Sequence, residues 1–329
     1  MLKQFSLAAL AAAMVAAVSA PAAAADLRII TFSGATNLPL WIAQDKGFYA
    51  KEGLNLTHAI TTGSTAEVKD LYDGKYDLMS SAFDNIVAYA ERQSDSPLPG
   101  PFDLVAVAGV HSGLNSVVVR PGIDGFAGIK GNKAAVDAAK SGYAIVLYQI
   151  LQKHGLTYGT DYTSLAVGST AKRFAALEDK SAAVAMIDTP TDIEAQKKGY
   201  KILADATTEI GAYQGSAIVV RRPWAAAHEA ELAAFLRANA AASDYIYSNR
   251  NDTIAELKSH IKDLSDDEIA ALYGRLTGPG GLNKHGEINL PGVDVVLKLR
   301  SEYGEPKKDM GPASKYVDVD YMKRALAGK

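Results

Sequence analysis

The chain has 329 residues, of which 48% are hydrophobic and 22% are charged, and it contains no cysteine. This composition is typical of a globular protein, and it excludes disulfide bonds and a cysteine nucleophile. The formal net charge of −3 provides no basic surface, so we expect no nucleic-acid partner.

Residues 1–25 have the pattern of a secretory signal peptide. Lys3 gives a positive start, residues 5–18 form an uncharged, mostly apolar segment, and small residues follow as far as Ala23-x-Ala25. We expect cleavage directly after this motif, with Val18-Ser19-Ala20 as a second candidate site. An uncleaved membrane anchor is the alternative, although the apolar segment is short for a bilayer span. Because no cysteine is present to carry a lipid, the sequence predicts a periplasmic protein that is not a lipoprotein.

The first predicted strand, residues 27–32, leads through a turn-prone loop into a short helix that Asn37 caps and Gly47 ends. Strand, small-residue loop and capped helix follow one another in many ligand sites at the carboxyl end of a sheet. An ordinary βα unit without a ligand has the same order, so this segment alone leaves both interpretations open.

Strand-like and helix-like segments then alternate, as a parallel α/β sheet requires. The predicted strands lie at residues 54–62, 76–80, 104–110, 116–120, 134–136, 164–167, 182–187, 200–204 and 216–220. The predicted helices lie at residues 64–73, 84–91, 143–154, 170–178, 191–198, 225–247, 251–261, 265–273 and 293–303. A chain of this length usually forms more than one core, so we expect two lobes.

The tetrapeptide Gly-Ser-Thr-Ala occurs at residues 63–66 and again at residues 168–171, each time between a predicted strand and a predicted helix. Backbone N–H groups at a helix start point outward, so both copies are suited to hold a ligand. The first copy, with Glu67 after it, also matches a capping box, as do Ser265 and Glu268. We interpret the repeat as two similar lobes that each present one loop to a shared cleft; chance repetition is the alternative.

Short motifs spread over nearly the whole chain are those of one protein family. They are Pro39-Leu40-Trp41-Ile42-Ala43, Lys46-Gly47-Phe48-Tyr49, Glu52-Gly53-Leu54, Gly63-Ser64, Ile129-Lys130-Gly131, Gly155-Leu156, Gly168-Ser169 and Ala176-Leu177. In these motifs the chain resembles the periplasmic substrate-binding proteins of ABC importers, in the group that binds sulfonates, taurine, nitrate and thiamine-precursor pyrimidines. One departure is Glu178-Asp179-Lys180, where the family more often has a glycine that ends the helix.

The resemblance implies a type II periplasmic binding protein fold of the α/β class, with two lobes that are each a sheet flanked by helices and that are joined by two crossing strands. Lobe one would comprise residues 26–117 and 219–329, and lobe two residues 118–218. A ligand that contacts both lobes stabilises the closed form, which docks on an ABC permease in the inner membrane. The resemblance therefore implies a monomeric carrier of a small molecule that is not an enzyme and uses no cofactor or metal.

Carried over position by position, the resemblance implies a ligand site between the lobes. In lobe one the candidate residues are Ser33, Gly34, Asn37, Ser64, Thr65, Phe83, Asp84 and Asn85. In lobe two they are Asp137, Ser141, Gly142, Tyr143, Ser169, Thr170, Arg173, Asp188, Thr189, Tyr213 and Gln214. Hydroxyls and helix-start N–H groups suit an oxyanion, Arg173 adds a positive charge, and Phe83 and Tyr143 flank a flat ring. The expected ligand is a small organic anion, a sulfonate or carboxylate with or without an aromatic ring.

Several of these residues have a structural explanation as well. Ser64 and Asp84 suit the caps of helices, and Arg173 suits a solvated surface. The aromatic residues that also suit a core are Phe83, Tyr143 and Trp41.

Other ligands and functions stay open. The acids Asp84, Asp137 and Asp188 disfavour a bare inorganic anion and favour a ligand with amine or hydroxyl donors. A thiamine-precursor pyrimidine or a related heteroaromatic molecule is the alternative ligand. A periplasmic sensor subunit is a further alternative, and so is an enzyme on the same fold. The six histidines have no metal-type spacing and no nucleophile motif is present, which argues against an enzyme.

Overall fold

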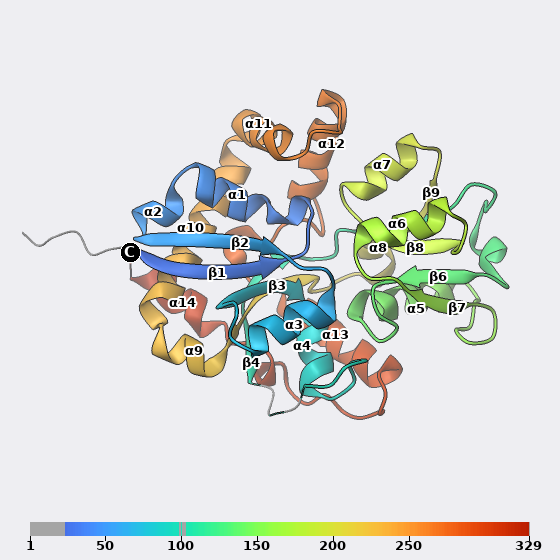
Figure 1. Cartoon of the computed structure of the whole chain (residues 1–329), viewed down its shortest axis with the longest axis horizontal. Helices are drawn as coiled ribbons and strands as arrows, with labels where there is room; N and C mark the ends of the chain where they lie inside the picture. Colours follow the sequence, from blue (N-terminus) through green and yellow to red (C-terminus); the bar gives the residue numbers. More distant parts are fainter. Residues whose placement is uncertain (1–23, 99, 101–102, 329) are drawn as a thin grey trace, which may run out of the picture.

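The computed structural model describes residues 24–98, 100 and 103–328. The expected signal peptide lies outside these residues, apart from its last two. Two five-stranded sheets, each flanked by helices, lie side by side in the described chain (Figure 1). None of the helices in this part of the chain is both long enough and apolar enough to cross a membrane. The two-lobed α/β fold expected from the sequence is confirmed.

The first sheet has the strand order β2-β1-β3-β10-β4. Its strands are β1 Ala25–Thr31, β2 Leu54–Ile60, β3 Leu78–Ala82, β4 Leu104–His111 and β10 Ser216–Arg221. β1 pairs in parallel with both β2 and β3, whereas β10 pairs in antiparallel fashion with β3 and β4. Parallel strands are joined by crossover helices, which explains the alternating pattern of the sequence.

The second sheet has the order β7-β6-β8-β5-β9. Its strands are β5 Asn115–Val119, β6 Lys133–Val136, β7 Thr163–Ala166, β8 Val184–Asp188 and β9 Lys201–Asp205. β6 pairs in parallel with β7 and β8, and β5 is antiparallel to β8 and β9. Each sheet thus has the same plan, in which the strand next to a crossing, β10 in the first sheet and β5 in the second, lies antiparallel between two other strands of its sheet. We keep the names lobe one and lobe two for the halves built on these two sheets.

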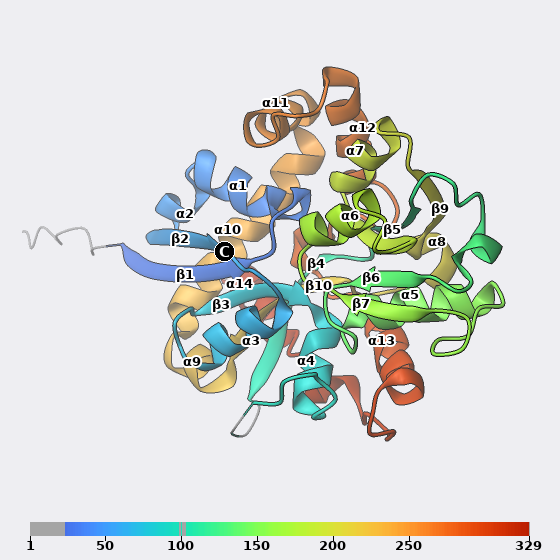
Figure 2. The same cartoon turned by 45° about the vertical axis from the view of Figure 1, so that its right-hand side comes forward.

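Helices cover both faces of each sheet (Figures 1 and 2). In lobe one they are α1 Leu38–Asp45, α2 Phe48–Lys51, α3 Ser64–Tyr72, α4 Phe83–Ala90, α9 Arg222–Ala227, α10 Glu229–Ser248, α11 Arg250–His260, α12 Asp266–Thr277, α13 Leu290–Tyr303 and α14 Asp320–Ala327. In lobe two they are α5 Gly142–Lys153, α6 Thr170–Glu178, α7 Thr191–Lys197 and α8 Ala206–Ile210. Short 3-10 turns lie at Ala35–Asn37, Phe126–Ile129, Lys284–Gly286 and Ala313–Lys315. The sequence did not predict α2, α8 or α14, which are short or lie in a polar tail.

The chain passes from the first sheet to the second within residues 112–114 and returns within residues 211–215. Both changes of sheet come a few residues before the boundaries that we expected after residues 117 and 218. The reason is that the crossings are short irregular segments, so all of β5 belongs to lobe two and all of β10 to lobe one. These two segments are the only covalent links between the lobes within the described residues from 103 to 328.

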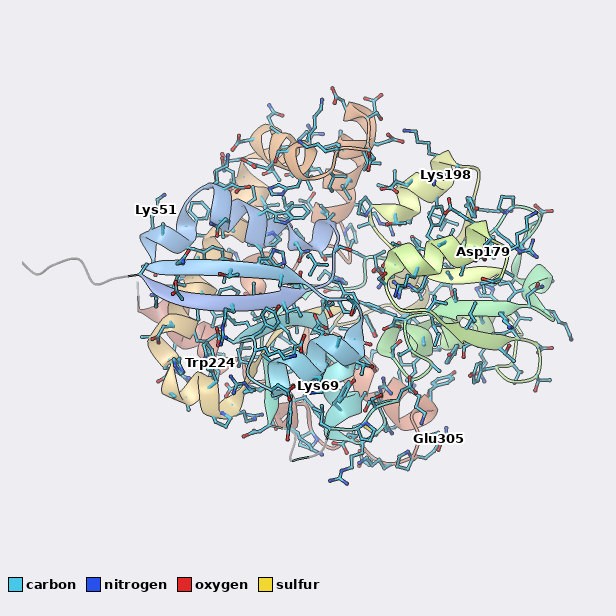
Figure 3. The ribbon with its side chains drawn as sticks, in the orientation of Figure 1. Lys51, Lys69, Asp179, Lys198, Trp224 and Glu305 are labelled. Carbon is cyan, nitrogen blue, oxygen red and sulfur yellow. The ribbon has the colours of Figure 1, made fainter. Side chains whose placement is uncertain are left out.

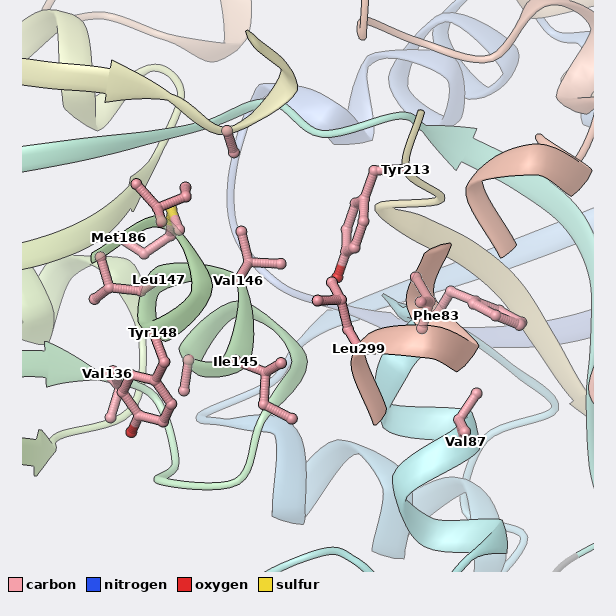
Figure 4. Close-up of a cluster of buried hydrophobic side chains, with 14 of the residues drawn as sticks. Phe83, Val87, Val136, Ile145, Val146, Leu147, Tyr148, Met186, Tyr213 and Leu299 are labelled. Atoms are coloured by element: carbon pink, nitrogen blue, oxygen red, sulfur yellow. The ribbon is translucent and has the colours of Figure 1, made fainter. Parts of the chain in front are cut away.

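One hydrophobic cluster is continuous across both lobes. It joins α5 of lobe two to α4 and α13 of lobe one, and Figure 4 shows Val146, Phe83 and Leu299 from these three helices together with Tyr213. On the opposite side of the interlobe contact, α1 and α11 of lobe one face α7 of lobe two (Figure 2). The lobes are therefore packed together along one side. On the other side, next to a cavity, Arg275 of α12 also joins them through ion pairs with Asp192 and Asp205 of lobe two.

The predicted helix caps Ser64 and Asp84 differ from the structure. Gly63 occupies the N-cap of α3, and Ser64 already lies in the first turn, where its hydroxyl does not cap the helix. α4 begins at Phe83, and Asp84 forms an ion pair with Arg300 instead of a cap. The capping box of Ser265 is confirmed, and Glu268 keeps its bond to the backbone N–H of Ser265 although its carboxylate also pairs with Lys197.

The first helix ends just before Gly47, as the sequence predicts. It starts at the predicted position, but the predicted capping hydrogen bond of Asn37 is not formed. Asn37 holds the N-cap position of α1, but its amide donates to the carbonyl oxygen of Phe32 at 2.8 Å and makes no capping bond. Gly47 follows α1 with φ of +71°, the left-handed conformation that favours glycine at a helix end.

Figure 3 shows charged side chains of both signs on the outer faces of the lobes, including Lys51, Lys69 and Asp179.

Candidate functional site

A cavity lies between the lobes at the carboxyl ends of the central strands. It encloses about 610 Å³ of empty space, part of which is open to solvent. Lobe one and the crossing contribute Phe32, Ser33, Gly34, Thr36, Asn37, Ser80, Ala82, Asn85, His111, Leu114 and Ser216. Lobe two contributes Asn115, Asp137, Tyr143, Arg173, Asp188 and Thr189. Ligands of α/β proteins bind at this edge of the sheet.

The backbones of the two lobes approach one another at two glycines beside this cavity. A Cβ atom on Gly34 of lobe one would lie 3.6 Å from the carbonyl oxygen of Thr189 in lobe two. A Cβ atom on Gly168 of lobe two would lie 3.6 Å from the carbonyl oxygen of Thr62 in lobe one. Both glycines have positive φ, so the close approach uses backbone conformations that other residues rarely adopt. The loops after the strands of the two lobes therefore meet around the cavity.

Arg173 carries the positive charge of the cavity. Arg173 is only 3% exposed, so the expectation of a solvated surface arginine is wrong. One terminal nitrogen donates to the hydroxyl of Thr170 at 2.7 Å and to Asp188 Oδ2 at 3.2 Å. The other lies 3.9 Å from Asp137 Oδ1. Two carboxylates thus share one guanidinium, which leaves an excess of one negative charge among these three groups.

Two polar atoms of this cluster have hydrogen-bonding capacity to spare. Asp188 Oδ1 and Arg173 Nε are buried and have no hydrogen-bond partner among the described residues. Both residues line the cavity. A buried polar atom without a partner is unfavourable, so a ligand that reaches these atoms gains more than one that only fills space. These two atoms, a carboxylate acceptor and a guanidinium donor, are buried in the wall of the cavity, so a ligand reaches them when their side chains move slightly.

Asp137 connects the two lobes. Ser64 of lobe one donates its hydroxyl to Asp137 Oδ2 at 3.3 Å, and Ser141 of lobe two donates to the other carboxylate oxygen. Ser64, Thr65 and Ser141 line a smaller cavity of about 240 Å³ that shares Asn85 with the main one. This bond across the cleft exists only while the lobes are together.

A buried carboxyl group lies close behind Asp137. Glu67 of α3 is fully buried, and burial raises its pKa well above the usual value. The charge of Asp137 raises the pKa of Glu67 further. The neutral form of Glu67 is therefore the one that the fold favours.

His111 forms the wall of the cavity next to the crossing. Its Nδ1 accepts hydrogen bonds from the backbone N–H groups of Gly113 at 3.1 Å and Leu114 at 3.3 Å, which places the ring proton on Nε2. Nε2 lies 3.4 Å from the hydroxyl of Tyr143, which is 3.2 Å from that of Ser216. Burial lowers the pKa of His111 to about 4, although the charge of Asp188 opposes this. His111 is therefore neutral at pH 7 and adds no charge to the site.

The structure brings about half of the predicted site residues together around the main cavity. These are Ser33, Gly34, Asn37, Asn85, Asp137, Tyr143, Arg173, Asp188 and Thr189. Ser64, Thr65 and Ser141 line the adjoining small cavity, and Thr170 lines the mouth described below. The loop positions implied by the resemblance therefore converge from both lobes.

The other predicted residues do not line the cavities. Phe83 is fully buried and Tyr213 is nearly so, and both belong to the hydrophobic cluster that spans the lobes. Asp84 is buried and accepts a hydrogen bond from Arg300 Nε at 2.8 Å. Burial raises the pKa of Asp84, and the charge of Arg300 limits this rise. A Cβ atom on Gly142 would lie 2.3 Å from Asp84 Cβ, so this glycine serves close packing of α5 against α4.

Two further predicted residues have structural roles. The side chain of Gln214 donates to the carbonyl oxygen of Ser216 at 2.7 Å and accepts from the backbone N–H of Asn289 at 2.7 Å. It therefore fixes the returning crossing. Ser169 occupies the N-cap of α6, without a side-chain capping bond, and lines none of the cavities described above.

Sequence reasoning missed several residues of the main cavity. They are Phe32, Thr36, Ser80, Ala82, His111, Leu114, Asn115 and Ser216. Most lie at the ends of β1, β3, β4, β5 and β10, so a search along all strand ends would have found them. His111 was set aside because it has no histidine neighbour in the sequence.

The cavity opens beside α1 and α11. A mouth with about 870 Å³ of empty space is lined by Trp41 and His260 of lobe one and by the loop from Asp188 to Thr191 of lobe two. Trp41 is partly exposed there and stacks on His260, with the ring centroids 4.4 Å apart. Its buried part packs against the hydrophobic core of lobe one, so its expected place in the core is confirmed in part. A solute can reach the cavity from this side without disturbing the packed side of the interlobe contact.

Comparisons with known proteins give the following matches. The family described as NMT1/THI5 like matches residues 35–252. A protein from Bordetella bronchiseptica RB50 is 21% identical, with a TM-score of 0.77 and coverage of 92% of this chain and 98% of that chain. The periplasmic nitrate-binding protein NrtA from Synechocystis PCC 6803 is 14% identical, with a TM-score of 0.78 and coverage of 92% and 88%.

A third solved structure is the alkanesulfonate-binding protein SsuA from Xanthomonas axonopodis pv. citri bound to MOPS. It is 17% identical, with a TM-score of 0.69 and coverage of 89% of this chain and 98% of that chain. No curated protein sequence matches the chain. At these identities the three structures establish the fold of the chain.

Proposed function

Because the chain belongs to the NMT1/THI5-like family, we propose that it is the periplasmic solute-binding subunit of an ABC importer. It captures a small organic molecule between its lobes and delivers that molecule, unchanged, to a permease in the inner membrane. Support comes from the cavity at the junction of two α/β lobes and from similar folds described as periplasmic nitrate- and alkanesulfonate-binding proteins. The protein acts as a monomer and carries out no chemistry on the solute.

Binding works through a shift of the open and closed populations. Residues 112–114 and 211–215 are the two crossings that link the lobes, so a rotation of one lobe against the other turns about them. A solute that touches Asp188 and Arg173 of lobe two together with Asn37 of lobe one has both sets of partners only in the closed form. Its binding therefore favours closure, and the permease recognises the closed shape.

The charges around the cavity favour a solute with hydrogen-bond donors. Arg173 faces two carboxylates, Asp137 and Asp188, so a bare sulfonate or carboxylate would bring a third negative charge into a buried site. An amino group, by contrast, satisfies Asp188 Oδ1, which has no partner of its own. Phe32 and Tyr143 add aromatic walls. The oxygen Asp188 Oδ1, which has no partner, is the observation that favours a flat, amino-substituted heteroaromatic solute over a simple organic anion.

A comparison of solutes by calorimetry and thermal unfolding tests the proposal. The probes are 4-aminopyrimidine derivatives, taurine and methanesulfonate, each recovered afterwards and checked for chemical change. We expect the aminopyrimidines to raise the melting temperature, since a ligand at 100 times its Kd adds about 2.7 kcal/mol to stability. Tighter binding of methanesulfonate would overturn the solute class and leave the carrier role intact. Conversion of any probe into product would overturn the carrier role itself.

A further inference from the structure

Three metal-ligating side chains converge outside the cavity, where the C-termini of α1 and α11 meet. Asp45 is the last residue of α1, and Glu256 and His260 lie in the last two turns of α11. One ligand atom from each of these three residues lies within 4.8 Å of the other two. His260 Nε2 and Asp45 Oδ2 are 2.8 Å apart. The three residues thus already present a nitrogen and carboxylate oxygens to one point at the surface.

The imidazole of His260 is held in a fixed orientation. Its ring stacks on Trp41 with a centroid distance of 4.4 Å and an interplanar angle of 4°. Glu256 and His260 are four residues apart on α11, so both side chains project from the same face of the helix. An oriented imidazole loses little freedom when it binds a ligand, which favours coordination at Nε2.

The local charge favours a cation at this point. Asp45, Asp252 and Glu256 provide three carboxylates, and Lys46 is the cation that pairs with two of them. The C-terminal ends of two helices also bring the partial negative charge of the helix dipole to the same region. Lys46 Nζ lies 2.6 Å from Glu256 Oε1 and 2.7 Å from Asp252 Oδ2. If Lys46 leaves Glu256 it keeps Asp252, so its pairing does not block a second cation.

We propose that Asp45, Glu256 and His260 form a Zn²⁺ site at the lip of the solute cleft. One imidazole nitrogen and two carboxylate oxygens are ligands that Zn²⁺ accepts, with water in the remaining position, whereas Ca²⁺ and Mg²⁺ take oxygen ligands and gain nothing from His260. The ion ties the end of α1 to α11 next to Trp41, at the mouth of the cavity. The site is independent of the proposed solute. It lay outside the sequence prediction because Asp45 is remote in sequence from the other two residues.

Zinc titration of the untagged protein tests the site. We expect one Zn²⁺ per chain by calorimetry, and with Co²⁺ as the probe we expect visible absorption bands of a protein-bound ion. His260→Ala and Asp45→Asn should each weaken Zn²⁺ binding about tenfold or more, since each removes one of three protein ligands. The matched control is His285→Ala. His285 also pairs with an acid, Asp244, at 2.8 Å, but it belongs to no such three-residue group in the described chain.

Lys46→Met gives a test in the opposite direction. It removes the competing cation and keeps the side-chain stem, so Zn²⁺ binding should become tighter. Melting temperatures of all variants without metal show whether each one is folded. Equal Zn²⁺ affinity in the wild type and in His260→Ala, or no zinc binding by the folded wild type, would overturn the proposal.

Discussion

Helices α3 and α6 occupy the same place in the two lobes, yet they carry different ionisable residues at the same helix position. Each follows an edge strand of its sheet, β2 in lobe one and β7 in lobe two, and has nine residues. The fourth residue is Glu67 in α3 and Arg173 in α6, and both are buried. Arg173 reaches the cavity and pairs with Asp188, whereas Glu67 lies behind Asp137 as a carboxyl whose pKa is raised. One fold plan, used twice, thus gives one lobe that holds the charged groups and one that supplies backbone and amides.

The repeated tetrapeptide differs between the lobes in the same way. Gly63 is the N-cap of α3, but Ser169 is the N-cap of α6, so the two copies are one residue out of register in the structure. Ser64 therefore lies in the first turn and donates across the cleft to Asp137. The repeat correctly places two loops at a shared cleft, and it does not predict what their side chains do.

The largest effect should come from Arg173→Ala. Its removal leaves the buried Asp137 and Asp188 without their shared cation, so the free energy of unfolding should decrease by about 3 kcal/mol. Urea unfolding with a constant m-value measures this. Lys172→Ala, at the exposed neighbouring position of α6, should leave stability unchanged. A decrease as small as that of the control would show that lobe two does not depend on the buried charge.

Asp188→Asn should mainly affect solute binding. β8 ends in Asp188, whereas β3, its counterpart in lobe one, ends in Ala82, so only lobe two offers a carboxylate here. A hydrogen bond to a charged group contributes about 1.5 to 3 kcal/mol, so the affinity for the aminopyrimidine probe should fall at least about tenfold. Calorimetry measures the loss. An unchanged affinity would move the recognition of the solute to lobe one.

Glu67→Gln should stabilise the protein, and more so at higher pH. The pKa of Glu67 is raised in the folded state, so the unfolded state loses its proton first as the pH rises above 4.5. Stability therefore falls as the pH rises toward the folded pKa, and a neutral glutamine removes this loss. We expect a gain of about 1 kcal/mol at pH 8 and almost none near pH 4, from urea unfolding at both values. A variant that is less stable at pH 8 would contradict a neutral Glu67.

The order of strands and helices could be predicted because two signals in the sequence are local: the spacing of hydrophobic residues and the glycines that end helices. Gly47 and Gly74 end α1 and α3 with positive φ at the places that the sequence indicated. The roles of Ser64 and Asp84 were not predictable, since their partners are Asp137 and Arg300, far away in the sequence. The loops of the site follow from local pattern, whereas the charges that face one another in it follow from packing of the lobes.

The same limit applies to aromatic residues and to histidine. Phe83 and Tyr143 are both aromatic residues near helix starts, but only Tyr143 lines the cavity, because α4 turns Phe83 into the cluster that spans the lobes. His111 became a wall of the site only through the crossing at residues 112–114, whose N–H groups orient its ring. Such roles depend on where the two lobes meet, which no local pattern records.

The smallest effect should come from Lys180→Gly, at the end of α6. Lys180 has φ of +64°, and its counterpart after α3, Gly74, has φ of +73°. A lysine pays a steric cost in this left-handed conformation, whereas glycine loses more freedom on folding, so the net gain should be about 0.5 kcal/mol. The converse change, Gly74→Ala, should lower stability, because its Cβ adds the same steric cost beside the guanidinium of Arg221 at 3.5 Å. A lower urea midpoint for Lys180→Gly would contradict this prediction. It would show that the side chain of Lys180 stabilises lobe two, and that the ends of α3 and α6 are not equivalent.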